Sequence, residues 1–381
     1  MTAWRLLIDD GVGAADGLAT DEALMRSYAG GSLPEPTLRL YSYRSHCALV
    51  GRFQDAAAEL DLDACRATGT EVDRRPTGGG AIIMGEQQLG VALVTSLRHP
   101  TTPPHARAII DSFGRGIVVG LARLGVRGEV RGKNDVAVNG RKIAGLGIYV
   151  DAHDAVLFHA SVLADLDIGF MLRVLNIPAA KLADKGVQKV SERITTVSRE
   201  TGSPVNVADL RGCVEAGFKE VFGISTERGR LTGEERAAGA SLLEQRYGTE
   251  GWLRQRVSDA PTGSSILKTP GGLLRIAVGL SGNALKEVMI SGDFMARERA
   301  VAEIEAALRW AGAERARVAD AVAEGTRRGG GLEGVGDADL TEAVWQAVVD
   351  AKHRRGAAGS CYYPNSDPLG VEPKQEATSW R

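Results

Sequence analysis

Residues 74–83 read Arg74-Arg75-Pro76-Thr77-Gly78-Gly79-Gly80-Ala81-Ile82-Ile83, which places two arginines before three glycines and an apolar run. Glycine has no Cβ, so this turn can adopt positive φ and a ligand can approach its N–H groups closely. Guanidinium groups beside such N–H groups suit a phosphate or a carboxylate, because arginine presents several donors in one plane. A tight loop with solvated arginines would have the same composition, since a glycine-rich turn alone is a weak signal. The choice between these interpretations therefore depends on other motifs.

A second motif follows at residues 132–145. Asn139-Gly140 stands between two alternating apolar runs, which is a strong signal for a β-hairpin because both turn positions favour positive φ. We expect residues 136–138 to pair with residues 142–149, so that Lys142 is held within a strand. A lysine on a strand can simply be solvated. Near an arginine-flanked glycine turn, it can instead balance the charge of an acyl phosphate.

The composition is that of an ordinary soluble protein. The chain has 381 residues, enough for two domains, with 25% charged and 44% hydrophobic residues. The formal net charge of −2 does not call for nucleic acid or a membrane surface as a partner. The N-terminus does not resemble a secretory leader, and no apolar stretch approaches the ~18 residues of a membrane helix. We therefore expect a cytoplasmic location.

The cysteines are widely spaced and form no C-x-x-C pair. In a chain with no secretory leader they are expected to be free thiols. They are Cys47, Cys65, Cys213 and Cys361.

Hydrophobic spacing predicts alternating helices and strands. The expected helices cover residues 16–25, 60–68, 105–125, 169–175, 297–310 and 340–349. The expected strands cover residues 37–43, 47–54, 81–84, 90–94 and 156–163. Gly329-Gly330-Gly331 is expected to be a linker, and the chain from residue 354 onward is expected to be irregular.

Two further features have ordinary explanations when taken alone. His159 lies in an apolar strand, where a histidine is more often part of the core than catalytic. Lys181 and Lys185 are one helical turn apart, which is typical of a solvated helix face.

With these motifs the sequence resembles the lipoate–protein ligase A family, within the wider biotin/lipoate ligase fold. The matching segments follow the family's order and cover about residues 5 to 255: residues 16–24, Gly51-Arg52-Phe53-Gln54, residues 74–81, Asn134-Asp135, residues 139–143, residues 159–163, and Lys185-Gly186 through Ser191 and Arg193. A weaker match at residues 273–276 and 287–294 resembles the accessory domain of some of these ligases.

The resemblance implies an α+β fold with mixed or antiparallel sheets flanked by helices. It implies a catalytic domain over residues 1–255, a small α/β accessory domain over residues 262–353, and an irregular tail over residues 354–381.

The resemblance also implies an acyl-adenylate-forming lipoate–protein ligase. Lipoate and ATP would give lipoyl-AMP, with Mg²⁺ as a cofactor, and the acyl group would pass to a lysine of a lipoyl carrier domain. The expected carrier is a 2-oxoacid dehydrogenase E2 subunit, the glycine cleavage H protein or a related specialised carrier. No nucleic acid or membrane partner is expected.

Site residues carry over by matching position. Lys142 would be catalytic at the acyl-phosphate junction and would also contact the lipoyl group. The positions matching nucleotide and adenylate contacts are Arg75, Gly80, Ala81, Ile82, Ile83, Asn134, Asp135 and Lys185. The positions matching lipoyl contacts are Arg74, Gly78, Gly79 and His159, and Asp135 is the candidate magnesium ligand.

Three alternatives remain. The first is an octanoyl or lipoyl transferase of the same fold that acts without ATP; it needs a nucleophilic cysteine, and one such branch has it where this chain has Ala179-Ala180. The second is a non-catalytic lipoyl-binding partner, which the retained Lys142 and Asn134-Asp135 disfavour. The third is a biotin–protein ligase, whose Gly-Arg-Gly-Arg motif is missing.

The chain also departs from the family's pattern. Met84-Gly85-Glu86 stands where His-Asp is common, His159-Ala160-Ser161 replaces His-Gly-Thr, and Lys133 replaces an arginine. These departures leave the preferred acyl chain and the carrier protein open.

Overall fold

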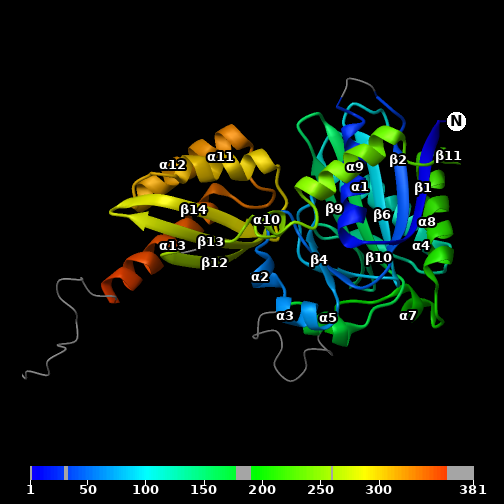
Figure 1. Cartoon of the computed structure of the whole chain (residues 1–381), viewed down its shortest axis with the longest axis horizontal. Coiled ribbons are helices and arrows are strands. Elements are labelled where there is room, and N and C mark those ends of the chain that lie inside the picture. Colours follow the sequence, from blue (N-terminus) through cyan, green and yellow to red (C-terminus); the bar gives the residue numbers. More distant parts are fainter. Residues whose placement is uncertain (1, 30–32, 177–189, 259–260, 358–381) are drawn as a thin grey trace, which may run out of the picture.

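The computed structural model describes residues 2–29, 33–176, 190–258 and 261–357. These residues form two lobes that lie side by side (Figure 1). No helix among them is long and apolar enough to cross a membrane. The segment with Lys181 and Lys185, and the tail beyond residue 357, lie outside the described residues.

The larger lobe is built on an eight-stranded mixed sheet in the order β11-β1-β2-β6-β10-β9-β8-β7. Strand β1 pairs in parallel with β2 and β11, whereas the other neighbours are antiparallel. The strands are β1 (Ala3–Val12), β2 (Thr37–Tyr43), β6 (Gln88–Ser96), β7 (Glu129–Arg131), β8 (Asp135–Val138), β9 (Arg141–Val150), β10 (Ala155–Leu163) and β11 (Ser225–Arg228). This arrangement confirms the expected α+β fold with a mixed sheet.

Helices cover both faces of this sheet. Helices α4 (Ala106–Ala122) and α8 (Val207–Phe222) pack on one face, and α1 (Ala14–Arg26) and α9 (Gly233–Gln245) pack on the other (Figure 1). Side chains alternate along a strand, so Phe158 of β10 joins the core under α4 while Leu157 joins the core under α1. His159 follows the same alternation and points toward α1.

The predicted hairpin is confirmed. Strands β8 and β9 pair antiparallel, and the turn residues Asn139 and Gly140 have φ of 51° and 78°. Lys142 lies at the start of β9 and is therefore fixed by the sheet.

A small second sheet carries the glycine-rich turn. Its strands are β3 (Cys47–Val50), β4 (Glu71–Arg74) and β5 (Ile82–Met84), in the order β4-β3-β5. Residues 75–81 connect β4 to β5. The short helices α2 (Ala56–Glu59), α3 (Leu62–Ala67) and α5 (Ile168–Val174) contribute to a small core against this sheet. Helices α7 (Val197–Thr201) and α10 (Glu250–Leu253) complete this lobe.

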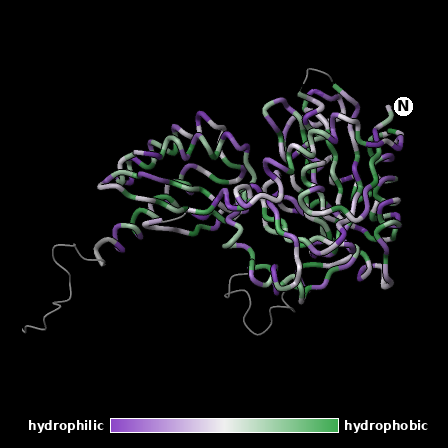
Figure 2. Tube along the Cα trace, in the orientation of Figure 1, coloured by the Kyte–Doolittle hydropathy of each residue, from purple (hydrophilic) through white to green (hydrophobic). Residues whose placement is uncertain are grey.

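The smaller lobe has its own sheet and its own core. Strands β12 (Gly263–Thr269), β13 (Gly272–Ser281) and β14 (Ala284–Gly292) form an antiparallel sheet packed with α11 (Glu298–Leu308), α12 (Arg315–Gly329) and α13 (Asp337–Ala357). In Figure 2, hydrophobic residues follow the strands inside both lobes. A small extra sheet domain is therefore present, while the exact division at residues 255 and 262 stays a prediction.

Helix α13 corrects one expectation. The sequence predicted a helix over residues 340–349 and an irregular chain from residue 354, but the helix runs from Asp337 to Ala357. Its buried face extends to Ala351, which is fully buried in the accessory core. Tertiary packing therefore stabilises more helical turns than the hydrophobic spacing of the sequence predicted.

The two lobes meet at the glycine-rich turn. The Gly79 N–H donates to the Phe294 carbonyl at 3.3 Å, and the Phe53 ring stacks on Phe294 with centroids 5.1 Å apart. Lys133 donates from Nζ to the carbonyls of Gly271 and Asp293, the latter at 3.1 Å. The accessory domain therefore contacts the turn directly.

Asp73 of β4 generates a prediction about stability. Its carboxylate accepts hydrogen bonds from the N–H groups of Arg74 and Gly248 at 2.7 and 2.8 Å, yet burial dominates and raises its pKa from 3.8 to about 6. The Asp73 carboxyl therefore stays protonated to a higher pH in the folded protein than in the unfolded protein. The stabilising contribution is complete below pH 3.8 and is lost as the pH rises through about 6.

We expect the free energy of unfolding of the wild type to fall by about 2.4 kcal/mol relative to Asp73→Asn between pH 4 and pH 7. Urea denaturation of both proteins across this range measures the difference. Asp63→Asn, at an exposed carboxylate, is the control and should show no such trend. A pH-independent difference between wild type and Asp73→Asn would contradict the prediction.

Candidate active site

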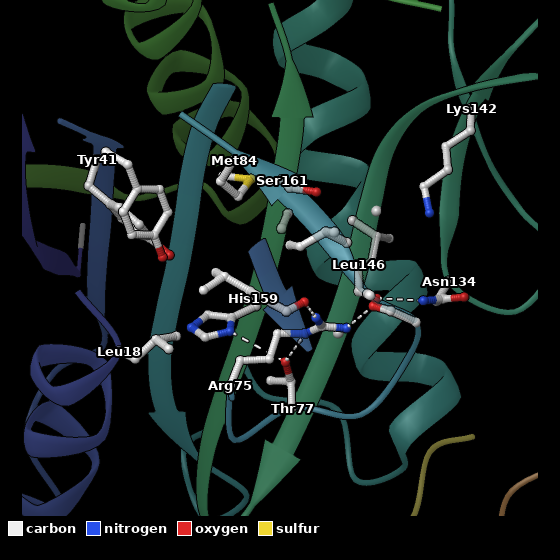
Figure 3. Close-up of a pocket in the computed structure, with 18 residues that line it drawn as sticks. Leu18, Tyr41, Arg75, Thr77, Met84, Asn134, Lys142, Leu146, His159 and Ser161 are labelled. Carbon is white, nitrogen blue, oxygen red and sulfur yellow. Dashed lines mark hydrogen bonds between the residues drawn. The ribbon is translucent and has the colours of Figure 1, made fainter. Parts of the chain in front are cut away.

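A cleft lies between the glycine-rich turn and strands β9 and β10 (Figure 3), and its empty space, open solvent included, is about 620 Å³. Apolar side chains form much of its wall: Leu18, Leu49, Ala81, Ile82, Met84 and Leu146. Polar side chains gather in the same wall: Tyr41, Tyr43, Arg75, Thr77, Asn134, Lys142, His159 and Ser161.

The cleft brings together only part of the predicted site. The predicted residues that line it are Arg75, Gly80, Ala81, Ile82, Asn134, Lys142 and His159. Those that do not line it are Arg74, Gly78, Gly79, Ile83 and Asp135, and Lys185 lies outside the described residues. The individual binding roles of all these residues stay predictions.

Arg75 shapes the glycine-rich turn from within. Its guanidinium donates to the carbonyls of Leu49, Gly78 and Gly80 at 2.8, 3.1 and 2.6 Å, and to Thr77 Oγ1 at 3.2 Å. Burial lowers its pKa to about 10, so it remains charged at neutral pH. Gly79 has φ of 94°, and a Cβ on Gly51 would lie 2.0 Å from the Gly79 carbonyl oxygen, so both glycines are required.

Arg74 has a different environment from its neighbour. It is fully buried and donates to the carbonyls of five residues at 2.6 to 3.0 Å: Gly51, Arg52, Gln54, Trp252 and Leu253. The Trp252 indole N–H donates back to the Arg74 carbonyl at 2.7 Å. Arg74 therefore ties the segment after β3 to α10, and it lies behind the cleft wall.

Lys142 and Asn134 lie on one side of the cleft, and His159 lies on the other (Figure 3). The Lys142 Nζ atom lies 2.7 Å from Asp135 Oδ1, and both side chains are more than a third exposed. Asn134 donates to the Leu146 carbonyl at 2.8 Å. Lys142 is thus held in the cleft wall by its strand, and its ammonium is paired with one carboxylate.

The magnesium role of Asp135 stays a prediction, and its carboxylate is paired with Lys142. Mg²⁺ is commonly held by one or two carboxylates together with substrate phosphates, so a protein cage is not required. Among the residues the structure describes, no group of three or more His, Cys, Asp or Glu side chains could hold a metal ion.

His159 belongs to a buried polar chain that the sequence analysis missed. Its Nε2 atom lies 2.8 Å from Asp21 Oδ2, and Arg39 donates from Nη1 to Asp21 Oδ1 at 2.7 Å. On the other side of the ring, Nδ1 lies 3.5 Å from Thr77 Oγ1. Burial alone would raise the pKa of the Asp21 carboxyl, but Arg39 and His159 outweigh it and hold that pKa below its ordinary value. The signal for Asp21 was an acidic residue three positions from both Leu18 and Leu24, on the apolar face of α1.

The described cysteines are poorly placed to act as nucleophiles. Cys47 and Cys65 are buried, Cys213 is half-buried, and none of the three lines the cleft. Burial raises the pKa of each of these thiols. A thiolate is the reactive form, so these environments oppose nucleophilic chemistry.

The fold and the cleft define an enzyme of the lipoate ligase and transferase class. The sequence profile of the "Lipoyl protein ligase A/B catalytic domain" matches residues 14–219, more than half of the chain. The chain belongs to this family, which confirms the resemblance seen in its motifs.

Individual relatives refine the comparison. An octanoyltransferase LipM of Symbiobacterium thermophilum is 30% identical over 273 residues, which cover 66% of this chain and 98% of that protein. A structure of a bi-partite lipoate protein ligase and its E2 lipoyl domain from Thermoplasma acidophilum matches with a TM-score of 0.61 and 28% identity, covering 68% of this chain and 99% of that chain. The structure of P. falciparum LipL1 in complex with lipoate has a TM-score of 0.69 over 90% of this chain and 99% of that chain; at 15% identity it supports the fold alone.

These relatives correct the main functional expectation. The sequence analysis predicted ATP-dependent ligation through lipoyl-AMP, but the curated relatives at 30% identity are named octanoyltransferases. A transferase moves an acyl group that is already activated, so it has no need to form an adenylate. The prediction of an ATP-dependent ligase is therefore wrong, and the transferase alternative agrees better with the relatives.

The buried environment of Arg74 predicts that this residue stabilises the fold, and a substitution can distinguish that role from binding of the lipoyl group. Arg74→Met leaves the carbonyls of five residues without this donor in a dry interior, so we expect a loss of about 3–5 kcal/mol in the free energy of unfolding. Chemical denaturation measures it, and Arg66→Met, at an exposed arginine, should stay within about 0.5 kcal/mol of wild type. Normal stability combined with a loss of acyl-donor binding would instead support the predicted lipoyl-binding role.

Proposed function

We propose that this chain transfers an octanoyl or lipoyl group from an acyl thioester to a lysine of a lipoyl carrier domain, without ATP. The observation that carries this proposal is a cleft whose wall is largely apolar and includes a strand-held ammonium group, that of Lys142. The apolar wall suits an aliphatic chain, and the ammonium suits the oxygen of its reacting carbonyl. The names of the curated relatives support the same reaction.

The proposed reaction is an aminolysis. The carrier lysine attacks the thioester carbonyl, a C–N bond forms, and the carbonyl oxygen gains negative charge. The C–S bond then breaks, and the thiol leaves with the proton that the amine loses. Lys142 stabilises the negative oxygen, because its charge is held in place before the reaction begins.

The transfer is proposed to be direct. The transferase alternative required a cysteine nucleophile, but the described cysteines are buried or half-buried and lie outside the cleft, and Cys361 lies outside the described residues. The segment that could hold such a cysteine in one branch contains alanines here. The carrier lysine itself is therefore the proposed nucleophile.

A lipoyl carrier is the proposed protein partner. The Thermoplasma acidophilum structure pairs a ligase of this fold with its E2 lipoyl domain, which supports a carrier of this kind. An E2 subunit, a glycine cleavage H protein and a specialised carrier remain the candidates. The cytoplasmic location stays a prediction.

Intact-mass analysis of an apo carrier domain tests the proposed function. We expect an octanoyl mass shift with octanoylated acyl carrier protein in the absence of ATP. A shift that appears only with free acid, ATP and magnesium would contradict the proposal. Tight carrier binding without any mass shift, with each candidate carrier and donor, would indicate a non-catalytic binding partner.

Lys142→Ala tests the role of the ammonium group. Loss of one preorganised partner of the developing oxyanion should lower the transfer rate by about 10²–10³-fold. The Lys142–Asp135 pair is more than a third exposed, so the free energy of unfolding should change by less than about 1 kcal/mol. Lys219→Ala, at a half-exposed lysine paired with Glu215 on α8, is the matched control and should keep its rate. A near-normal rate in Lys142→Ala would refute this role.

A further inference from the structure

A continuous chain of polar contacts leads from the buried interior to the cleft. Arg39 is paired with Asp21, Asp21 with His159 Nε2, His159 Nδ1 faces Thr77, and Thr77 accepts from Arg75. Arg39, Asp21 and Thr77 are at most 1% exposed, while Thr77, His159 and Arg75 also form part of the cleft wall. These polar residues come from β2, α1, β10 and the glycine-rich turn, so their contacts form only in the folded protein.

The hydrogen-bond partners in this series of polar contacts determine which nitrogen of His159 carries the hydrogen. The pKa of Asp21 is held low, so the group is a carboxylate and can only accept hydrogen bonds. It accepts from Arg39 through Oδ1 and from His159 through Oδ2, which requires a hydrogen on His159 Nε2. A neutral imidazole then has a free lone pair on Nδ1.

Thr77 completes the arrangement. Its Oγ1 accepts from Arg75 Nε at 3.2 Å, which leaves its own hydroxyl hydrogen available to Nδ1 at 3.5 Å. One lone pair of Oγ1 remains and can accept a proton from the cleft. Contacts of this length often tighten only when substrate is bound.

We propose that Asp21 is a positioning residue that fixes the His159 tautomer, so that His159 Nδ1 receives the reaction's proton through Thr77. This inference rests on the proposed acyl transfer. As the C–N bond forms, the attacking nitrogen gives a proton to Thr77 Oγ1, and Thr77 gives its own to His159. When the C–S bond breaks, His159 gives a proton back to Thr77, and Thr77 gives one to the leaving thiolate. His159 and Thr77 therefore end the cycle in their starting protonation states.

Electrostatics favour Asp21 as the group that stabilises the imidazolium. The ionisable groups around His159 come from α1, β2, the glycine-rich turn and β9: Asp21, Arg39, Tyr41, Tyr43, Arg75 and Lys142. Burial raises the pKa of both tyrosines, so they are neutral. Of this set, Asp21 alone carries negative charge, and it contacts the ring directly.

Asp21→Asn tests the inference with almost no change in shape. The Asn oxygen can still accept from Arg39, but its NH₂ group must donate to His159 Nε2. The hydrogen then moves to Nδ1, which can no longer accept from Thr77. Long-range ¹⁵N NMR of the labelled protein reads the tautomer directly, and we expect Nε2–H in the wild type and Nδ1–H in the variant.

Kinetics with the acyl thioester measure the consequence. We expect kcat of Asp21→Asn to fall by about 10²–10⁴-fold with little change in KM, as for other imidazoles held in the wrong tautomer. Asp9→Asn is the matched control, because Asp9 pairs with the same Arg39 at 2.6 Å without touching His159. It should keep the wild-type tautomer and rate. Thr77→Ser should retain most activity, and Thr77→Val should lose it.

The outcomes separate this inference from the proposed function. No octanoyl transfer by the wild type would refute the proposed function, while the NMR spectra would still decide the tautomer that Asp21 imposes. Normal wild-type transfer with the hydrogen on Nδ1 would overturn the inference alone. Full activity of Asp21→Asn or of Thr77→Val would overturn it as well.

Discussion

The hold of Arg75 on the backbone of the glycine-rich turn is the constraint on which the site depends. A single buried guanidinium gathers the carbonyls of Leu49, Gly78 and Gly80 and orients Thr77. These contacts set the position of one cleft wall relative to β3 and aim a hydroxyl at His159. A lysine could not replace it, because one ammonium cannot reach several carbonyls in a fixed plane. The close approach of Gly51 to Gly79 then removes the remaining freedom of the turn.

Local signals predicted much of the fold. The Asn139-Gly140 turn depends only on two residues that accept positive φ, and the apolar spacing of α4 depends only on neighbours along the chain. These features need no knowledge of distant contacts. Helix α13 was predicted too short because its length depends on packing against a separate core, and no local signal records that contact.

The candidate site was predicted in part, for a related reason. Arg75 and Arg74 are adjacent and chemically identical in the sequence, yet alternation along the chain sends one into the cleft wall and the other behind it. Asp21 and Arg39 join the candidate site through tertiary contacts of α1 and β2 with β10, which the sequence does not reveal. The choice between ligase and transferase was beyond the motifs as well, since both reactions need a fixed cation and an apolar slot. The names of the relatives contradict the ligase prediction and agree better with a transferase.

The contact between Gly79 and Phe294 links the two lobes to the chemistry of the turn. A backbone N–H has one hydrogen, and here the accessory domain's carbonyl takes it. A ligand oxygen that accepted this hydrogen would compete with the Phe294 carbonyl of the accessory domain. Ligand binding at Gly79 would then weaken docking of the domain by the same free energy by which docking weakens ligand binding. The Gly79 N–H is therefore occupied by the accessory domain and is not free for an anion while this contact is kept.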